Sequence, residues 1–479
     1  MMDFDFTSAS VEMAITKWDN HNGNLDPEQS VIAWGAPVAV APVTPMSHCV
    51  FHGLTRLAPL TIMPDTIRTP QESEMNAKPQ ARFDRRQALK GLAGASLMGA
   101  LPWSAQAQAK AINVGVILPL SGGNAQFGIN SKQGIELVAD EINASGGIKA
   151  LGGAKINLVV ADSTSAPASA ATVAQRMIAE NECCAILGAF ASSLTLAIQE
   201  VTERRRVPLL TMSYSDQLTG RGFKHIFQVT SKGSVIGQAQ LNFALDLLGG
   251  KTKINKIAIM YEDTAYGTST AKGLRDAAKT DGVEIVMDEA YPLGITDVTP
   301  LINKLRASKA QMVFPVSYLN DSLLIVRALR QQKINLPIVG GSAGYVIPDF
   351  EKALGEYADG VLSICSANYD QDLSLTDRYR KRYNTLMVHE ALEHAVLMDV
   401  LAQAMGVAKS TKPEDIGQAL RSTTFNQGWA KAMTNGQVKF DESGLNVHAD
   451  PVMVQWQNKE LVTVWPQKYA KAKMINRQL

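Results

Sequence analysis

The feature that most constrains this fold is an alternation of short apolar runs with stretches of helical periodicity, which begins at residue 112 and repeats along the chain. The run 112–118 is followed by apolar residues that recur every three or four positions between 134 and 142. Short apolar runs bounded by turns are typical of buried strands, and the second spacing is typical of amphipathic helices. Repeated strand–helix units predict parallel sheets covered by helices, so the expected fold class is α/β.

The alternation restarts near residue 231, which divides the chain into two similar halves. The first half is expected to hold strands at 112–118, 156–161, 184–187 and 208–212, and helices at 134–142, 168–180 and 193–204. The second half is expected to hold strands at 257–260, 283–287, 312–316 and 338–339, and helices at 235–248, 267–280, 298–306 and 322–332. A helical run at 386–408 and strands at 438–440 and 452–455 follow. Two open sheets that face one another create a ligand cleft at the carboxyl ends of their strands.

The composition limits the class of protein. Of the 479 residues 46% are hydrophobic and 19% charged, and the formal net charge is +1. A near-neutral balance argues against a nucleic-acid partner, which usually requires a basic surface. Four cysteines are too few and too scattered for a disulfide framework or a zinc site, and we expect buried free thiols, with a single pairing after export as the alternative. They are Cys49, Cys183, Cys184 and Cys365. No apolar run approaches the roughly 20 residues that span a bilayer.

An export signal is expected well inside the sequence. The segment 84–90 contains Arg85 and Arg86, a small apolar segment follows at 91–103, and alanines alternate between 105 and 109. A basic region, an apolar region and an Ala-x-Ala site predict a signal peptide, here of the twin-arginine type, cleaved between 107 and 109. An amphipathic helix is the alternative. We therefore expect a periplasmic protein, with 1–74 disordered or untranslated, translation starting at Met75, and 75–109 as signal peptide.

Several fragments imitate catalytic motifs without completing them. Gly123 and Gly128 have phosphate-loop spacing, but Ile129 and Asn130 stand where Lys and Ser/Thr are required. The histidines of the segment 389–394 are five residues apart, which places them about 140° apart on a helix, so they cannot share one metal ion. A solvated helix face is the better prediction there. The segment 341–344 lacks the spacing of a nucleophile elbow. We expect no enzyme activity, no cofactor and no metal.

A series of short motifs runs in order along the chain. They are INVGVILPLSG at 112–122, FG at 127–128, EIN at 141–143, GAFASSLT at 188–195, VPLL at 207–210, YG at 266–267 and GQVKFD at 436–441. In this order and spacing, residues 110–479 resemble the branched-chain amino-acid and amide binding proteins, which are type I periplasmic binding proteins of ABC transporters. The resemblance implies two Rossmann-like lobes with open, mainly parallel sheets, joined by a hinge of three crossings near residues 230, 362 and 447. The N-terminal lobe would comprise 110–230 and 363–447, and the C-terminal lobe 231–362 and 448–479.

The resemblance also implies a ligand site in the first lobe. In that family the loop that matches 191–195 holds the ligand's carboxylate, which would make Ser192, Ser193 and Thr195 ligand-binding residues. The local physics agrees, because a helix that starts at these serines offers unpaired N–H donors to an anion. The alternative is that the serines only cap the helix. Ser213 and Ser215 match a second loop at the same end.

Phe127 of the first lobe matches an aromatic residue that closes over the ligand, although it could merely pack against its own helix. The second lobe would complete the site. Tyr266 and Tyr318 could each supply a ring face and a hydroxyl. Ser342 stands where amino-acid binders of this family often carry an acid that pairs with the α-ammonium group; Asp321 could substitute, or it could cap the following helix. The ligand is therefore expected to be an amino acid, an amide or a carboxylate.

The expected function is that of an extracytoplasmic solute-binding protein of an ABC importer. The ligand would bridge both lobes and shift the protein to a closed form, which a permease with its ATPase would receive. We expect a monomer. The alternative is a ligand-sensing receptor component of the amide-sensor type.

Overall fold

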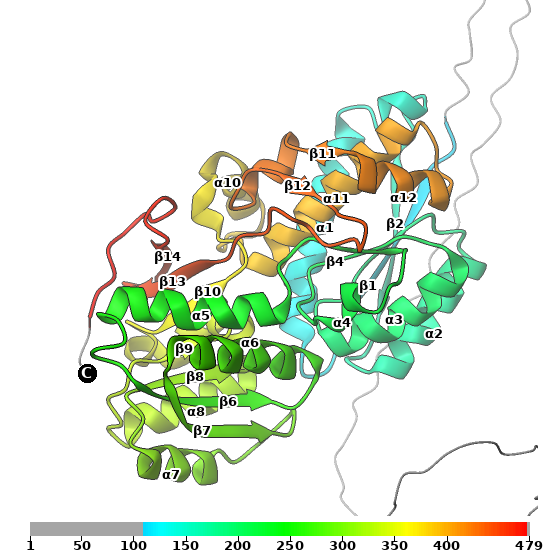
Figure 1. The fold of residues 1–479 in the computed structure, drawn as a ribbon. Coiled ribbons are helices and arrows are strands. Elements are labelled where there is room, and N and C mark those ends of the chain that lie inside the picture. Colours follow the sequence, from blue (N-terminus) through cyan, green and yellow to red (C-terminus); the bar gives the residue numbers. More distant parts are fainter. Residues whose placement is uncertain (1–108, 477–479) are drawn as a thin grey trace, which may run out of the picture. The chain divides into compact units, whose positions relative to one another are not determined.

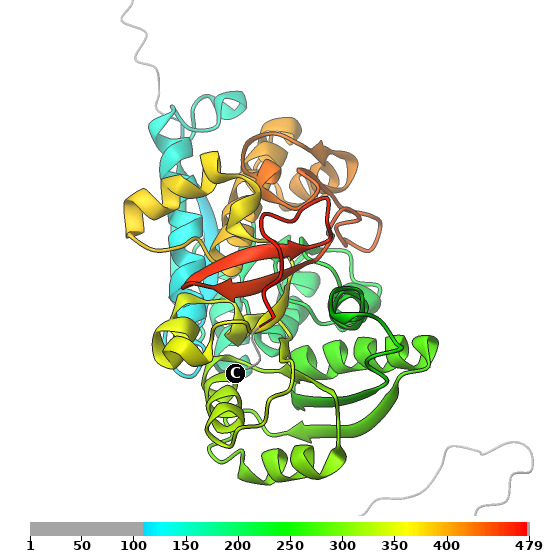
Figure 2. The same cartoon turned by 90° about the vertical axis from the view of Figure 1, so that its left-hand side faces the viewer.

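The computed structural model describes residues 109–476, which form two α/β lobes (Figures 1 and 2). The predicted extension 1–74, almost all of the predicted signal peptide with Arg85 and Arg86, and Cys49 lie outside the described residues. In Figure 1 the first lobe is built from the cyan, teal and orange parts of the chain, and the second from the green, yellow-green and red parts. The predicted fold class is confirmed.

The first lobe is built on a five-stranded parallel sheet with the order β2-β1-β3-β4-β5. Its strands are β1 (Ile112–Leu118), β2 (Ile156–Asp162), β3 (Ile186–Gly188), β4 (Leu209–Thr211) and β5 (Ile226–Gln228). Its helices are α1 (Ala125–Ala144), α2 (Pro167–Ala179), α3 (Ser192–Arg205), α4 (Gln217–Gly220), α11 (His389–Ala408) and α12 (Pro413–Ser422). The central strands are buried on both faces, which explains their continuous apolar runs. The strand order reverses direction at β1, and ligands of such sheets bind beside that point.

The second lobe contains a parallel sheet with the order β7-β6-β8 and a mixed sheet with the order β14-β13-β10-β9, joined by a bridge between Val313 and Ile338. The strands are β6 (Lys256–Glu262), β7 (Glu284–Tyr291), β8 (Met312–Val316), β9 (Val339–Gly340), β10 (Leu362–Cys365), β13 (Val452–Gln457) and β14 (Glu460–Trp465). The helices are α5 (Gly233–Leu248), α6 (Ala265–Asp281), α7 (Thr299–Ser308), α8 (Leu319–Gln331) and α9 (Pro348–Leu354). A Cβ at Gly237 would lie 2.0 Å from the Thr270 carbonyl oxygen, so this glycine allows α5 and α6 to pack closely.

The remaining elements are short. They are α10 (Leu373–Tyr383), β11 (Thr424–Phe425), β12 (Val438–Lys439) and the 3-10 turns Lys149–Leu151, Ala343–Tyr345, Gly355–Tyr357, Tyr369–Gln371 and Gly428–Ala432.

The chain passes between the two sheets at three places. Two of these segments lie side by side, because Gln228 forms a bridge with Leu445 and the Asn446 side-chain amide donates to the Val229 carbonyl oxygen at 2.9 Å. The third passage follows β10. This strand stays in the second sheet until Cys365, three residues beyond the predicted crossing at 362, because its last residue still pairs with β13. We propose the predicted division into two lobes with that one shift.

Helix α11 differs most from its prediction. The segment 389–394 was predicted to be a solvated face, but its four ionisable side chains are at most 2% exposed, so that prediction is wrong. The reason is tertiary: α11 packs against α1, α12 and the 3-10 turn 428–432. Among the described helices α11 is long and apolar enough to cross a membrane, yet 72% of the apolar window is buried within the protein, as expected for a core helix.

Candidate functional site

The loops that follow the carboxyl ends of strands from both lobes meet at one small cavity. It is lined by Phe190, Ser192, Met212, Tyr214, Tyr266, Tyr318 and Ala343. These residues follow β3, β4, β6, β8 and β9, so each lobe contributes through the edge at which open α/β sheets bind ligands. The cavity measures about 10 Å³, close to the volume that one water needs. The side chains of the two lobes therefore almost fill it, as expected for a closed form.

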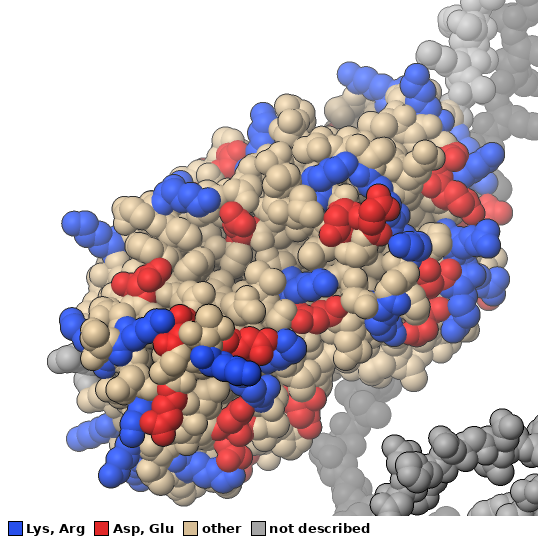
Figure 3. Space-filling model, in the orientation of Figure 1, with Lys and Arg blue, Asp and Glu red and all other residues tan. Residues whose placement is uncertain are grey.

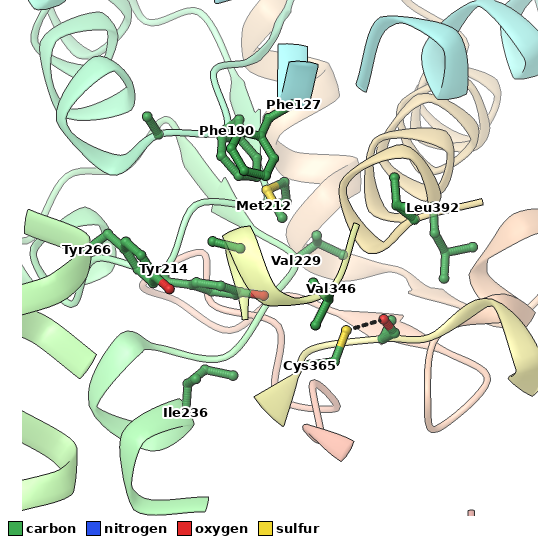
Figure 4. Close-up of a cluster of buried hydrophobic side chains, with 14 of the residues drawn as sticks. Phe127, Phe190, Met212, Tyr214, Val229, Ile236, Tyr266, Val346, Cys365 and Leu392 are labelled. Atoms are coloured by element: carbon green, nitrogen blue, oxygen red, sulfur yellow. Dashed lines mark hydrogen bonds between the residues drawn. The ribbon is translucent and has the colours of Figure 1, made fainter. Parts of the chain in front are cut away.

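Four of the seven residues that line this cavity are aromatic, and Figure 4 shows Phe190, Tyr214 and Tyr266 among the buried side chains of this region. Phe127 stacks on Phe190 with 4.3 Å between ring centroids, and Tyr318 lies 6.0 Å from Phe127. Tyr266 lies 5.3 Å from Tyr318 and 6.0 Å from Tyr214. Phe127 thus packs against residues of both lobes and not only against its own helix. Such walls suit an apolar or aromatic ligand side chain.

The first turn of α3 supplies hydrogen-bond donors. Ser192 is the first residue of α3, and no side chain caps this helix. The Ser192 hydroxyl instead accepts a hydrogen bond from the Ser215 N–H at 3.1 Å. Within residues 109–476 the N–H groups of Ser192 and Ser193 donate to no other protein atom. A helix N-terminus with free donors favours an anion, so the arrangement can hold a carboxylate.

The other predicted hydroxyls of the first lobe support this turn. The Thr195 and Ser213 hydroxyl oxygens lie 2.7 Å apart, and the Ser213 hydroxyl donates to the Phe190 carbonyl oxygen at 2.6 Å. Ser215 is fully buried and accepts from the Gln217 N–H. Neither these three residues nor the half-buried Ser193 side chain line the cavity. The structure therefore brings them near the cavity but places Ser192 alone of the five at its wall.

The second lobe supplies tyrosine hydroxyls and no acid. The Tyr266 hydroxyl donates to the Gly341 carbonyl oxygen at 2.6 Å. Burial raises the pKa of Tyr266 and Tyr318 well above the usual value, so both stay neutral. Asp321 lies in the first turn of α8, where its carboxylate accepts from the Tyr318 N–H at 3.2 Å and from the Tyr291 hydroxyl at 2.8 Å. Two roles were predicted for Asp321, pairing with a ligand ammonium group and capping the following helix. The structure shows it in the capping role.

Ser342 connects the two lobes through a tyrosine that the sequence did not reveal. Its hydroxyl lies 3.2 Å from the Tyr214 hydroxyl, which lies 2.7 Å from the Ser366 hydroxyl. Ser366 in turn donates to a carboxylate oxygen of Glu393 on α11. Tyr214 lies between the two predicted serines of its loop, and Phe190 lies inside the motif at 188–195. These positions were the sequence signal that could have identified both residues as part of the site.

Four ionisable side chains of α11 lie behind the aromatic wall. The His389 ring lies 6.3 Å from the Phe190 ring, and its Nδ1 lies 2.9 Å from a Glu390 carboxylate oxygen. Burial opposes the charged form of His389, but Glu390 raises its pKa overall. Burial raises the pKa of Glu393 to about 8 and lowers that of His394 to about 4. None of the His, Cys, Asp and Glu side chains in the described part of the chain group in a way that could hold a metal ion.

The cysteines in the described part of the chain are buried, and the face shown in Figure 3 carries charges of both signs. Cys183, Cys184 and Cys365 are free and buried. Burial raises the pKa of Cys183 to about 11 and that of Cys184 to about 12, so both are protonated thiols. On the face shown in Figure 3, basic and acidic side chains are interspersed.

Comparison with known proteins places this geometry in a family. Residues 111–459 match the family model described as periplasmic binding protein. Leu/Ile/Val-binding protein homolog 8 of Brucella suis biovar 1 (strain 1330) is 32% identical over 399 residues, which cover 80% of this chain and 98% of that protein. The LivJ substrate-binding protein of a branched-chain amino acid transporter from Streptococcus pneumoniae, solved with isoleucine, is 26% identical with a TM-score of 0.65, covering 73% of this chain and 97% of LivJ.

A second similar structure shares the fold alone. The solute-binding protein of an ABC transporter from R. palustris, solved with benzoate, has a TM-score of 0.64 at 18% identity and covers 74% of this chain and 95% of that one.

Proposed function

The chain belongs to the periplasmic binding protein family, in its Leu/Ile/Val-binding type, and on that premise we propose that it captures a small carboxylate-bearing solute and delivers it to an ABC permease. The observation that carries this proposal is the free N-terminal turn of α3, which faces a ring of aromatic side chains from both lobes. An anion-binding turn beside apolar walls fits a ligand that has a carboxylate at one end and an apolar body.

Hinge closure is the proposed mechanism. The first lobe would bind the carboxylate at Ser192 and the N–H of Ser193, and Tyr266 and Tyr318 would then close over the ligand body. The Tyr214–Ser342 hydrogen bond joins a first-lobe loop to a second-lobe loop, so it would stabilise the closed form. The paired segments around Gln228 and Leu445 would flex as the lobes move. A ligand that contacts both lobes favours the closed state by its differential affinity.

The proposed ligand class follows from the features that the ligands of two similar structures have in common. The LivJ structure holds isoleucine and the R. palustris structure holds benzoate, and both ligands are carboxylates with an apolar body. We assign the same common features to the ligand of this chain. The segment around Arg85 and Arg86 would act as the export signal, so the protein would bind its ligand in the periplasm. It would act there as a monomer.

Calorimetry on a matched pair of variants tests this function. Purified protein is first screened by thermal shift against amino acids, aromatic acids and short amides, and the tightest ligand is then titrated. Ser192→Ala should weaken binding about 10- to 100-fold, because a hydrogen bond to a charged group is lost. Ser193→Ala, one residue along the same turn, should change affinity less than about threefold, because its side chain does not line the cavity. Equal affinities for wild type and Ser192→Ala would show that the pocket lies elsewhere.

A further inference from the structure

A chain of buried hydroxyl groups joins the pocket to a buried carboxyl group. It runs from Ser342 through Tyr214 and Ser366 to Glu393, with oxygen–oxygen distances of 3.2 Å and 2.7 Å over the first two steps. All four side chains are at most 5% exposed, and Tyr214 lines the pocket. Ser342, which was predicted to bind the ligand, is not among the residues that line the cavity, and its position is one at which amino-acid binders of this family often carry an acid. The series of hydrogen-bonded side chains that starts there ends at Glu393, an acid on helix α11.

The carboxylate of Glu393 makes fewer hydrogen bonds with the described residues than it could accept. One of its carboxylate oxygens accepts from Ser366, and the other has no hydrogen-bond partner within residues 109–476. Leaving a buried acceptor unpaired is costly, so a purely structural carboxylate is normally given donors for both oxygens. The side chain is 0% exposed, so water at the surface does not meet this need. Glu393 is linked through Ser366 to Tyr214, a residue that lines the pocket, so a role in binding explains its position better.

We infer that Glu393 determines specificity: acting through Ser366 and Tyr214, it makes the pocket prefer a ligand that carries an ammonium group over the same ligand without one. This inference rests on the proposed function, because it names the ligand class of the same pocket. When Glu393 is ionised, Ser366 donates to it and Tyr214 donates to Ser366. The Tyr214 oxygen, which lies 3.2 Å from the Ser342 hydroxyl and belongs to a residue that lines the pocket, would then accept a hydrogen bond from Ser342 or from the ligand. The buried negative charge adds an attraction for a cation in a medium of low dielectric constant.

Binding of an ammonium group is coupled to a proton. The ionisable groups that face Glu393 are His389 and Glu390 from α11, Tyr214 from the loop after β4 and Cys365 from β10. Burial raises the pKa of Glu393 to about 8, so near pH 7 most of the free protein holds a proton there. A cationic ligand stabilises the ionised form, and the proton leaves Glu393 for the buffer. Affinity for such a ligand should therefore rise with pH between about 6 and 8, by at most about tenfold per unit.

The test compares each amino acid of a panel with its deaminated counterpart, such as leucine with 4-methylpentanoate. At least one amino acid should bind about tenfold or more tightly than its counterpart, and it should release protons in calorimetry with buffers of different ionisation enthalpy. In Glu393→Gln this ratio should fall to about threefold or less and the proton release should vanish, while affinity for the deaminated compound changes less than about threefold.

Two further variants separate this role from a structural one. Ser366→Ala keeps the carboxylate but breaks the hydroxyl chain, and it should lower the ratio in the same direction; it decides the question if Glu393→Gln does not fold. Asp399→Asn removes another acid of α11, one that accepts from the Trp429 N–H at 2.7 Å, and it should keep the ratio. Equal binding of both members of every pair, or an unchanged ratio in Ser366→Ala and Glu393→Gln, overturns the inference and leaves the proposed function standing. If no compound of the panel binds, both fail.

Discussion

Two buried carboxyl groups flank the aromatic pocket, and they differ in how the fold uses them. Asp321 in α8 accepts hydrogen bonds from the Tyr318 N–H and the Tyr291 hydroxyl, and so completes a helix cap. Glu393 in α11 accepts only from Ser366, and its second oxygen has no partner in the described part of the chain. Burial raises both pKa values, to about 7 and about 8. We propose that the two groups have different roles: Asp321 contributes to stability and Glu393 to recognition of the ligand.

The largest expected effect is on stability, through Asp321. Asp321→Ala should lower the free energy of unfolding by about 2–4 kcal/mol, because two buried donors lose their acceptor. Denaturant unfolding measures this loss. The matched control is Asp297→Ala, which removes an exposed aspartate that accepts from the Thr299 N–H at the start of α7 and should cost about 1 kcal/mol or less. Equal losses in the two variants would contradict the assigned cap.

The second effect is a pH dependence that both carboxyl groups share. Their pKa values are raised on folding, so between about pH 4 and pH 8 the folded protein holds more protons than the unfolded chain. The free energy of unfolding should therefore be higher at pH 5 than at pH 8, with these two groups contributing about 1 kcal/mol or more. The double variant Asp321→Asn, Glu393→Gln should lose that contribution. A wild type and double variant with the same pH profile would refute it.

The smallest effect is the stability change of Glu393→Gln. This variant should alter the free energy of unfolding by less than about 1 kcal/mol, because the raised pKa keeps most of Glu393 neutral at pH 7 and glutamine keeps an acceptor for Ser366. Chemical denaturation at pH 7, run beside Asp321→Asn, gives the comparison. A loss above about 2 kcal/mol would mean that Glu393 is a structural residue like Asp321.

Local sequence patterns predicted the strands and helices that have a clear period of their own. Strand β8 was predicted with its observed bounds, and α3 and α6 were predicted to within two residues at each end. Strand β10 was missed, because it is completed by pairing with β13, about 90 residues away, which no local window contains. Helix α1 begins at Ala125, nine residues before the predicted start. Its first turns were not predicted because they follow a glycine-rich turn and show no regular apolar stripe in the sequence.

The site was predicted in part, for a related reason. Family motifs pointed to Ser192 and Tyr266, and the place of Tyr318 in the loop after a predicted strand pointed to that residue. The structure places all three at the cavity. Charged residues are rarely fully buried, so the sequence of α11 gave no reason to place Glu393 in the interior. Only the packing of α11 against α1 and the loops of both sheets brings that side chain to Ser366. That contact depends on the tertiary structure.

The most direct test of the central claim is a crystal structure of the protein with the tightest-binding compound of the ligand panel. The account predicts that the ligand lies between the two lobes, with its carboxylate within hydrogen-bond distance of the Ser192 hydroxyl and the Ser193 N–H and its apolar body against Tyr266 and Tyr318. A ligand bound outside this ring of aromatic residues, or one whose carboxylate points away from the first turn of α3, would contradict it.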